Sequence, residues 1–519
     1  MLKTDKNLKA EEDLTGQSRF AWNLMVSWVS QLALIFSGFI MPRVVDEKIG
    51  QVALGIWDFG WTFVGYLTLL GFGMGACFNR YIAKYRASNE IDKLNEVANS
   101  VVFIQIGIAT FVTGVTLLFF FILPVYFSTS LQGFESQAQW VILFLGFSLT
   151  LQMLSGSARG LLTGYHRWDI HNALHAGSSL LSLLLMLCSL FYTDMGVVGM
   201  ALSYFIATLI FESLRFYFVR RVCHEFHFNL RLAKRKVGLQ MFTFSLKSML
   251  ANLPPILLLQ SINLMIVTVL GPAALAIFAR PMALTRHINT FMSKFTLMLT
   301  PTTGALEVNQ DMTHIQDLYL YSTRLSFAFS LPLLAFLFTY GDVLLTFWMG
   351  SDYALWSLMM VLSIGQVLSI AQDTSIRILM GLDQHGKISI YAFLTVLFIF
   401  IILFFFFASS HWTLTKAAIC FVVPLTCVYG FMIPIYTCRK LALSYFKYCQ
   451  RCFFLPLLYL LPYLVALSCS RILFDQGEVL FACLLFAVSV ALTLLIYFIY
   501  LVPRSLKQKL YLKLGLKSR

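Results

Sequence analysis

Four basic side chains lie in one apolar stretch of the sequence, between Gly271-Pro272 and Thr300-Pro301. They are Arg280, Arg286, His287 and Lys294. The stretch predicts a single helix long enough to cross a bilayer, where a charged side chain costs about 2.5–3.5 kcal/mol at the centre. Arg280, His287 and Lys294 are seven residues apart and therefore share one helix face. We interpret this face as the lining of a water-filled cavity that receives an anionic substrate. Alternatively, Lys294 and Arg280 snorkel to the inner and outer interfaces, and only His287 is internal.

Four further charged residues are candidates for the same site. Lys247, early in the preceding helix, is either a further cationic lining residue or a side chain that snorkels to the inner interface. Asp58 is a candidate for ion coupling, for an ion pair with Arg280, or for contact with water at the outer interface. Asp373 and Arg377 are four residues apart and predict an intrahelical ion pair, with a role in coupling as the alternative.

Glu212 and Arg215 are three residues apart in another apolar segment. Their spacing also predicts an intrahelical ion pair.

The helices that must position these residues are evident from composition. Of 519 residues, 59% are hydrophobic and 12% charged, and the mean hydropathy is +0.78. Apolar segments of about 20 residues recur along the whole chain, each long enough to span a bilayer. The fold class is therefore predicted to be an all-α polytopic membrane protein. The first segment, 20–41, is too long for a signal-peptide core and is expected to remain in the mature protein.

Charge and cysteine content exclude several functional classes. The net charge is +14, but the basic residues lie in alternate loops, which is the positive-inside pattern and not a nucleic-acid footprint. The cysteines predict no disulfide framework, and Cys449 and Cys452 have no second pair of metal ligands. The sequence contains no recognisable nucleophile–base pair, so no enzyme activity, cofactor or metal is predicted.

Fourteen transmembrane helices are predicted, with both termini cytoplasmic because the leader, the tail and every second loop are rich in Lys and Arg. The expected organisation is a cytoplasmic leader, a six-helix lobe, a cytoplasmic linker, a second six-helix lobe, an extra helix pair and a basic tail. Their ranges are 1–18, 19–221, 222–243, 244–438, 439–503 and 504–519.

Short sequence matches indicate that the second lobe repeats the first. The segment 157–161 (SARGL) matches 375–379 (SIRIL), and each is followed by a glycine, Gly164 or Gly381, and a polar turn. The segment 52–55 (VALG) likewise matches 273–276 (AALA). The shared offset of about 220 residues predicts two parallel copies around a central cavity, an arrangement suited to alternating access.

A family resemblance rests on several motifs in order. They are the opening of the first helix, 19–23 (RFAWN), with Pro42 at its end; the run 71–76 (GFGMGA) with 79–83 (NRYIA); the glycine-containing turns; and 270–274 (LGPAA). From about 19 to 440 the chain resembles the polysaccharide (Wzx-type) flippases of the multidrug/oligosaccharidyl-lipid/polysaccharide (MOP) exporter superfamily.

The resemblance implies two six-helix lobes in a V, an extra helix pair, and a location in the bacterial inner membrane. It implies translocation of an undecaprenyl-pyrophosphate-linked glycan from the inner to the outer leaflet, with membrane lipids, a proton or sodium ion and a polysaccharide polymerase as possible partners. Position 263 is Asn, where many relatives carry an acidic residue, which leaves the ion-coupling site open.

Two other transport functions remain open. A flippase for the peptidoglycan precursor also has fourteen helices and a cationic cavity. A cation-coupled multidrug antiporter has the same fold, but the predicted first helix, 20–42, has no acidic residue, and the basic residues between 280 and 294 would repel a cation.

Overall fold

The computed structural model describes residues 20–71, 74–131, 133–297, 299–308, 310–473 and 479–501, and every regular element in these ranges is a helix. The predicted leader, the tail, the loop 475–478 and the motif residues Arg19, Phe72 and Gly73 lie outside them. Within them, ten helical stretches are long and apolar enough to cross a membrane. The all-helical membrane class is therefore as predicted, whereas the number of fourteen spans stays a prediction.

The chain divides into two compact units. The first contains Met1–Asn252 and Asn263–Ala273, and the second contains Leu253–Ile262 and Ala274–Arg519. The helices of the first unit are α1 (Phe20–Thr68), α2 (Met74–Ala87), α3 (Ile91–Tyr126), α4 (Ser128–Leu131), α5 (Glu135–Leu154), α6 (Gly156–Gly164), α7 (Trp168–Tyr192) and α8 (Gly196–Val222). The helix α9 (Arg235–Leu270) contributes to both units.

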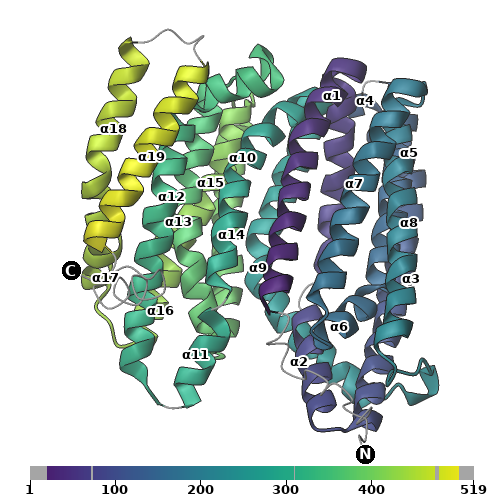
Figure 1. Cartoon of the computed structure of the whole chain (residues 1–519). Coiled ribbons are helices and arrows are strands. Elements are labelled where there is room, and N and C mark those ends of the chain that lie inside the picture. Colours follow the sequence, from purple (N-terminus) through teal and green to yellow (C-terminus); the bar gives the residue numbers. More distant parts are fainter. Residues whose placement is uncertain are drawn as a thin grey trace, which may run out of the picture. The chain divides into compact units, whose positions relative to one another are not determined.

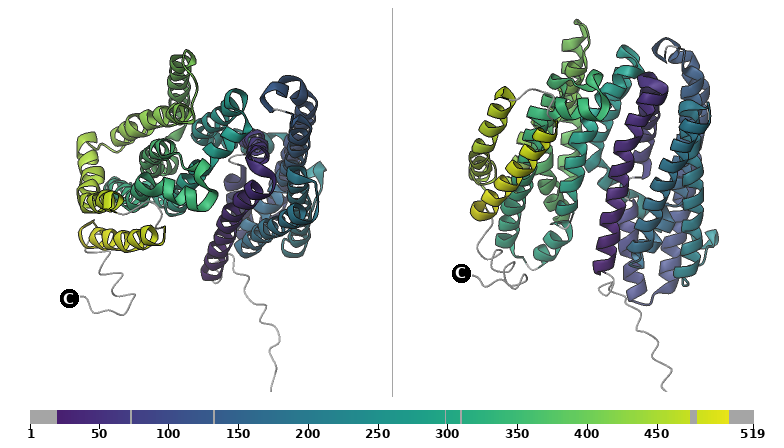
Figure 2. Two further views of the ribbon diagram at one scale, coloured as in Figure 1. Left: turned by 90° about the horizontal axis from the view of Figure 1, so that it is seen from above. Right: turned by 45° about the horizontal axis from the view of Figure 1, so that its top comes forward.

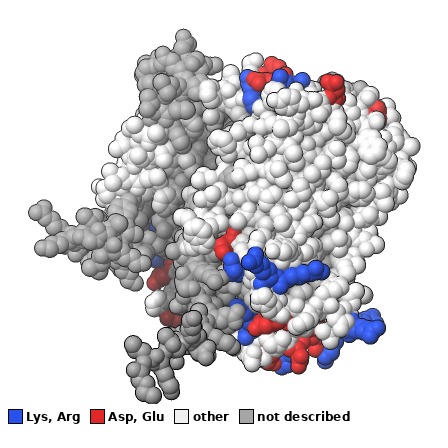
Figure 3. All heavy atoms as spheres, turned by 45° about the vertical axis from the view of Figure 1, so that its right-hand side comes forward, with Lys and Arg blue, Asp and Glu red and all other residues white. Residues whose placement is uncertain are grey.

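The second unit continues with α10 (Pro272–Thr296), α11 (Leu299–Val308), α12 (Met312–Met349), α13 (Trp356–Gly381), α14 (His385–Ala408), α15 (Leu414–Cys427) and α16 (Ile433–Lys440). It ends with α17 (Tyr445–Cys449), α18 (Leu455–Leu473) and α19 (Val479–Leu501), and α18 and α19 lie side by side (Figures 1 and 2). One face of the molecule carries charged side chains towards its two ends, separated by a broad band without them (Figure 3). A bilayer core requires such a band.

Backbone conformation supports the internal duplication. Four pairs of residues with positive φ recur 217 to 221 positions apart: Gly50 and Gly271, Asn89 and Gln310, Gly133 and Gly350, His166 and Asp383. Such conformations are uncommon outside glycine, so their recurrence at nearly the same offset indicates that the turns of the two copies are built alike.

Two predicted helix boundaries were wrong. The predicted first helix, 20–42, does not end at Pro42, because α1 continues through Asp46 and Glu47 and only Gly50 leaves the helical conformation, with φ 85° and ψ 167°. The predicted helix 272–301 ends at Thr296, and Pro301 lies in the first turn of the separate helix α11. Proline lacks the N–H that would extend a helix through it, and it is tolerated in a first turn.

The glycines that close the repeated motif serve packing and not the turn itself. A Cβ at Gly164 would lie 2.6 Å from the Ile82 side chain, and one at Gly381 would lie 2.8 Å from the backbone oxygen of Thr300. The left-handed turn residues are instead His166 and Asp383. Both glycines therefore allow a close approach between helices: α6 to α2 in the first copy, and α13 to the start of α11 in the second.

The linker between α8 and α9 is fastened to α3 by side-chain amides. Asn95 donates to the Glu225 carbonyl at 2.8 Å and accepts from the His227 N–H at 2.7 Å. Asn99 donates to the His227 carbonyl at 2.9 Å and accepts from the Asn229 N–H at 2.8 Å. This segment thus finds its backbone partners on α3. The helix after it begins at Arg235, nine residues before the predicted start at 244.

The extra helix α18 is anchored to α12 by a bidentate ion pair. Arg471 donates to Asp342 through two nitrogens, at 2.9 and 2.6 Å. Nearby, Tyr463 donates to the Pro332 carbonyl at 3.0 Å, and the Tyr340 and Ser470 hydroxyls lie 2.7 Å apart.

Candidate functional site: the basic face of α10 and a polar cavity in the first unit

The basic residues predicted to form a row lie on α10, which is helical throughout, so positions 280, 287 and 294 share one face. Arg280 is buried, with 5% of its surface exposed, whereas His287 is half-buried and Arg286 exposed. The side chains of Lys294, on α10, and Lys247, on α9, lie outside the described residues. The place of Lys247 in the row stays a prediction.

The opposite face of α10 carries the polar contacts to α13. Asn289 donates to the Gln366 side chain at 3.2 Å, and the Thr296 hydroxyl donates to the Asp373 carboxylate. In each pair the two partners are 77 residues apart in the sequence. The helices α10 and α13 therefore run in the same direction and keep a constant register. Residues 289 and 296 each lie two positions beyond 287 and 294, which is about 200° around the helix. The basic face therefore points away from α13.

The predicted ion pair between Asp373 and Arg377 is present, with 3.4 Å between Asp373 Oδ1 and Arg377 Nε. Asp373 is also held by Thr296, so its carboxylate joins α13 to the end of α10. Asp58 is half-buried on α1, and its carbonyl accepts a hydrogen bond from Thr62 Oγ1 at 3.0 Å. The pairing of Asp58 with Arg280 would join the two units and stays a prediction.

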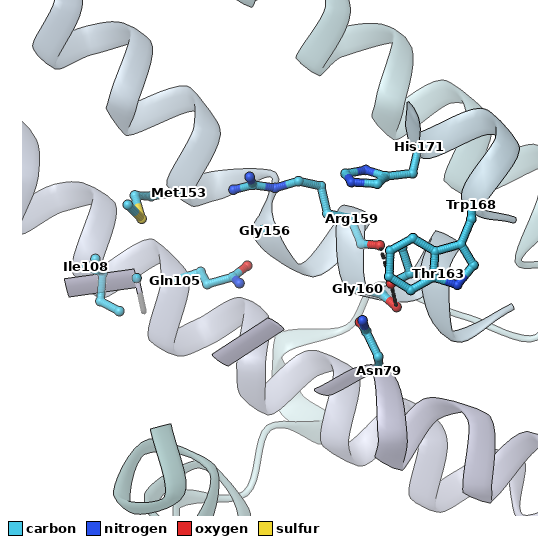
Figure 4. Close-up of a pocket in the computed structure, with 11 residues that line it drawn as sticks. Asn79, Gln105, Ile108, Met153, Gly156, Arg159, Gly160, Thr163, Trp168 and His171 are labelled. Atoms are coloured by element: carbon cyan, nitrogen blue, oxygen red, sulfur yellow. Dashed lines mark hydrogen bonds between the residues drawn. The ribbon is translucent and has the colours of Figure 1, made fainter. Parts of the chain in front are cut away.

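A polar cavity of about 410 Å³ lies in the first unit, where α2, α3, α6 and α7 come together (Figure 4). Its lining contains one guanidinium, one imidazole, one indole and two carboxamides, from Arg159, His171, Trp168, Asn79 and Gln105. Figure 4 shows the Arg159 and His171 side chains next to each other, and the Gln105 and Asn79 carboxamides on the other side of the cavity.

Partly buried hydrogen bonds fix two of these side chains. Arg159 donates to the Gln152 carbonyl at 2.5 Å. His171 Nδ1 lies 3.0 Å from a terminal nitrogen of Arg215, which also pairs with Glu212 at 2.8 Å. The Glu212–Arg215 pair predicted from spacing is therefore present, and only 1% of the Arg215 side chain is exposed.

Arg159 was recognised from the sequence only as part of the repeated motif 157–161, and not as a residue that lines a cavity. The signal was available, because Arg159, like Arg280, is a charged residue in a long apolar helix, where such residues are functional candidates. The other lining residues gave no signal, since they come from segments up to about 100 residues apart in the sequence.

Comparisons with known proteins agree with this architecture. The family model described as "Polysaccharide biosynthesis protein" matches residues 20–306, more than half of the chain. No curated protein matches the sequence.

Several solved structures share the fold. The inward-facing conformation of a multidrug resistance MATE family transporter of the MOP superfamily matches with a TM-score of 0.68 and 15% identity, over 79% of this chain and 94% of that chain. The outward-facing conformation of a multidrug resistance MATE family transporter of the MOP superfamily matches with a TM-score of 0.62 and 15% identity, over 83% of this chain and 96% of that chain. A MOP superfamily transporter from Pyrococcus furiosus, described by a reversed polarity of its binding pocket, matches with a TM-score of 0.60 and 15% identity, over 83% and 96%.

The family model confirms the resemblance that the sequence motifs carried, and the structural neighbours confirm the fold. The solved structures that share this fold are membrane transporters. The chain belongs to the polysaccharide biosynthesis protein family and has the fold of the MOP superfamily transporters.

Proposed function

We propose that this protein is a flippase that moves an undecaprenyl-pyrophosphate-linked oligosaccharide from the inner to the outer leaflet of a bacterial inner membrane. The cargo is the repeat unit of an O-antigen, a capsule or an exopolysaccharide. The observation that carries the proposal is the basic face of α10, with Arg280, His287 and Lys294 in one row, in a member of a polysaccharide biosynthesis family.

The physical reason is the charge of the cargo. A pyrophosphate loses its hydration when it enters the membrane interior, and this cost must be offset by cationic, hydrogen-bonding groups. Successive members of the row are about 10 Å apart along the helix, so the anion could pass from one to the next. The polyprenyl chain stays in the bilayer, where its burial is favourable.

Alternating access completes the proposed mechanism. Fourteen helices form two six-helix lobes around a central cavity, with an extra pair, and both termini are cytoplasmic. The cavity opens first to the inner and then to the outer leaflet. Asp58 and the Asp373–Arg377 pair are the proposed coupling groups, for a proton or a sodium ion, and a polysaccharide polymerase takes up the product.

Two other cargos define the alternatives. The peptidoglycan precursor also carries a pyrophosphate, so the basic row alone does not distinguish it. An organic cation would be repelled by Arg280 and Arg286, which makes the multidrug antiporter the weaker alternative in spite of the shared fold.

The test is a panel of cargos in proteoliposomes that contain the full-length chain. We expect transfer of a fluorescent undecaprenyl-pyrophosphate oligosaccharide between leaflets, no more than slow transfer of the peptidoglycan precursor, and no efflux of ethidium. Faster transfer of the precursor would replace the proposed cargo, and ethidium efflux without glycan transfer would refute the proposal.

A further inference from the structure

The cavity around Arg159 contains an uncompensated positive charge. Among the described residues, the guanidinium of Arg159 donates one hydrogen bond, to the Gln152 carbonyl, and forms no ion pair. No Asp or Glu is among the described residues that line this cavity. The neighbouring Arg215 does not add to the charge, because it is paired with Glu212. The site therefore has a net charge close to +1, which favours an anionic ligand.

The internal duplication shows that this charge is specific to the first copy. When the two copies are aligned so that Arg159 matches Arg377, Ser155 matches Asp373, which is the ion-pair partner of Arg377. Arg377 is paired with Asp373 at 3.4 Å, whereas Ser155 is fully buried and donates to the Gln152 carbonyl at 3.3 Å. The second copy thus neutralises its arginine, and the first copy leaves it available.

His171 adds a neutral hydrogen-bond donor. A guanidinium can only donate, so the 3.0 Å contact with Arg215 makes His171 Nδ1 the acceptor. In a neutral imidazole the proton is then on Nε2. His171 therefore offers an N–H next to Arg159, and the Gln105 and Asn79 carboxamides face them from the other side of the cavity (Figure 4).

The lining also suits a sugar. Trp168 lines the cavity with 41% of its surface exposed, and an indole with one apolar face and one polar edge is typical of sugar-stacking and interfacial positions. The volume of about 410 Å³ is near the lower end of the ~300–1,000 Å³ range of small-ligand pockets. It suits a phosphorylated group with one sugar better than a whole repeat unit.

We propose that this cavity binds the pyrophosphate and first sugar of the lipid-linked cargo before translocation, with Arg159 as the anion contact and His171, Gln105 and Asn79 as hydrogen-bonding groups. This inference rests on the proposed function for the identity of the cargo and for the assignment of this end of the unit to the cytoplasmic side. The site lies wholly within the first unit and is distinct from the basic face of α10.

The test measures binding of radiolabelled farnesyl pyrophosphate to the purified full-length chain in detergent. Arg159→Gln should raise Kd at least 10-fold, whereas Arg231→Gln, an exposed linker arginine, should leave it unchanged. Farnesol should not displace the bound farnesyl pyrophosphate, because it has no anionic group. Inorganic pyrophosphate should displace it, but more weakly than unlabelled farnesyl pyrophosphate does, because the lipid chain contributes to affinity. Equal competition by inorganic pyrophosphate would assign the site to the free anion and overturn its role as a lipid-headgroup site.

A matched pair of variants tests the charge argument without removing Arg159. Ser155→Asp recreates the ion pair of the second copy, and Ser155→Asn introduces a side chain of the same size without the charge. We expect weakened binding only for Ser155→Asp. Equal binding by both variants, or wild-type binding by Arg159→Gln, would overturn the proposal. Arg159→Lys, which keeps the charge, should retain most of the affinity and serves if Arg159→Gln does not fold.

Failure of this inference is distinguishable from failure of the proposed function. Glycan transfer by Arg159→Gln at the wild-type rate and with the wild-type KM would refute the site and leave the flippase proposal standing. Arg159-dependent binding of farnesyl pyrophosphate without any glycan transfer would support the site and refute the flippase.

Discussion

Gly50 and Gly271 have almost the same backbone conformation, with φ 85° and ψ 167° at one and φ 88° and ψ 171° at the other. Each separates two consecutive helical segments at the same place in its copy of the repeat. This region of φ and ψ is essentially restricted to glycine. The two glycines thus form the sharp connections after the first helix of each copy. The sequence predicted both breaks, but it placed the first at Pro42 and only the second at its observed position, Gly271.

Gly50→Ala should destabilise the protein by about 1–3 kcal/mol through backbone strain alone, because a Cβ at this position would meet nothing within 4 Å. Thermal unfolding in detergent measures this as a lower Tm. Gly107→Ala is the matched control, since Gly107 is helical and its Cβ would also meet nothing within 4 Å. The control should be neutral or slightly stabilising, and an equal loss for both variants would contradict the strain argument.

Asn99→Ala should release the linker from α3. The Asn99 side chain is fully buried and satisfies the His227 carbonyl and the Asn229 N–H, so its loss leaves buried backbone groups unpaired, at a cost of about 1–3 kcal/mol. We expect faster tryptic cleavage after Arg231. Asn229→Ala, which removes an exposed side chain bonded to the Arg231 N–H, should accelerate cleavage less. Cleavage of Asn99→Ala at the wild-type rate would show that the clamp is unimportant.

Cys223, at the end of α8, should resist alkylation in the folded protein. Burial raises the pKa of its thiol to about 12, and the thiolate is the reactive form. At pH 8 about one thiol in 10⁴ would be ionised, against roughly a quarter at the ordinary pKa near 8.5. Mass spectrometry after iodoacetamide treatment should find Cys223 unmodified in the folded protein, and modified once the chain is unfolded by a denaturing detergent. Rapid modification of the folded protein would contradict its burial.

Asp373→Ser converts the second copy to the residue type of the first. It removes the carboxylate that holds both Arg377 and Thr296, whose contacts are largely buried. Loss of one partner costs about 3–5 kcal/mol in a fully buried pair and about 0–1 kcal/mol in an exposed pair. The Asp373–Arg377 pair lies between these cases, so we expect the free energy of unfolding to fall by about 2 kcal/mol, which a lower Tm would report. Asp352→Ser, at an exposed residue, should change Tm little; an equal shift in both would mean that the pair is not stabilising.

The features that could be predicted from the sequence are those that depend on local composition and on the spacing of residues along a helix. Apolar segments gave the helical membrane class, the motif matches gave the repeat, and spacing gave the Asp373–Arg377 and Glu212–Arg215 pairs. Pairs of this kind depend on residues one helical turn apart, so no tertiary information is needed to predict them.

The rest required three-dimensional packing. The Arg471–Asp342 pair joins residues 129 positions apart, and no local pattern predicts that distance. The Arg159 cavity depends on which faces of α2, α3, α6 and α7 turn towards one another, and this is set by packing. The roles of Gly164 and Gly381 could not be assigned from the sequence for the same reason: a glycine near a turn looks alike in sequence whether it is needed for positive φ or for a close helix contact.

The most direct test of the central claim compares charge variants of the basic face in the glycan-transfer assay. Arg280→Gln and Lys294→Gln should each slow transfer of the undecaprenyl-pyrophosphate oligosaccharide at least 10-fold, Arg280→Lys should retain much of the rate, and Arg231→Gln should match the wild type, at equal amounts of folded protein. Transfer at the wild-type rate in both Arg280→Gln and Lys294→Gln would contradict the claim that these cations serve an anionic cargo.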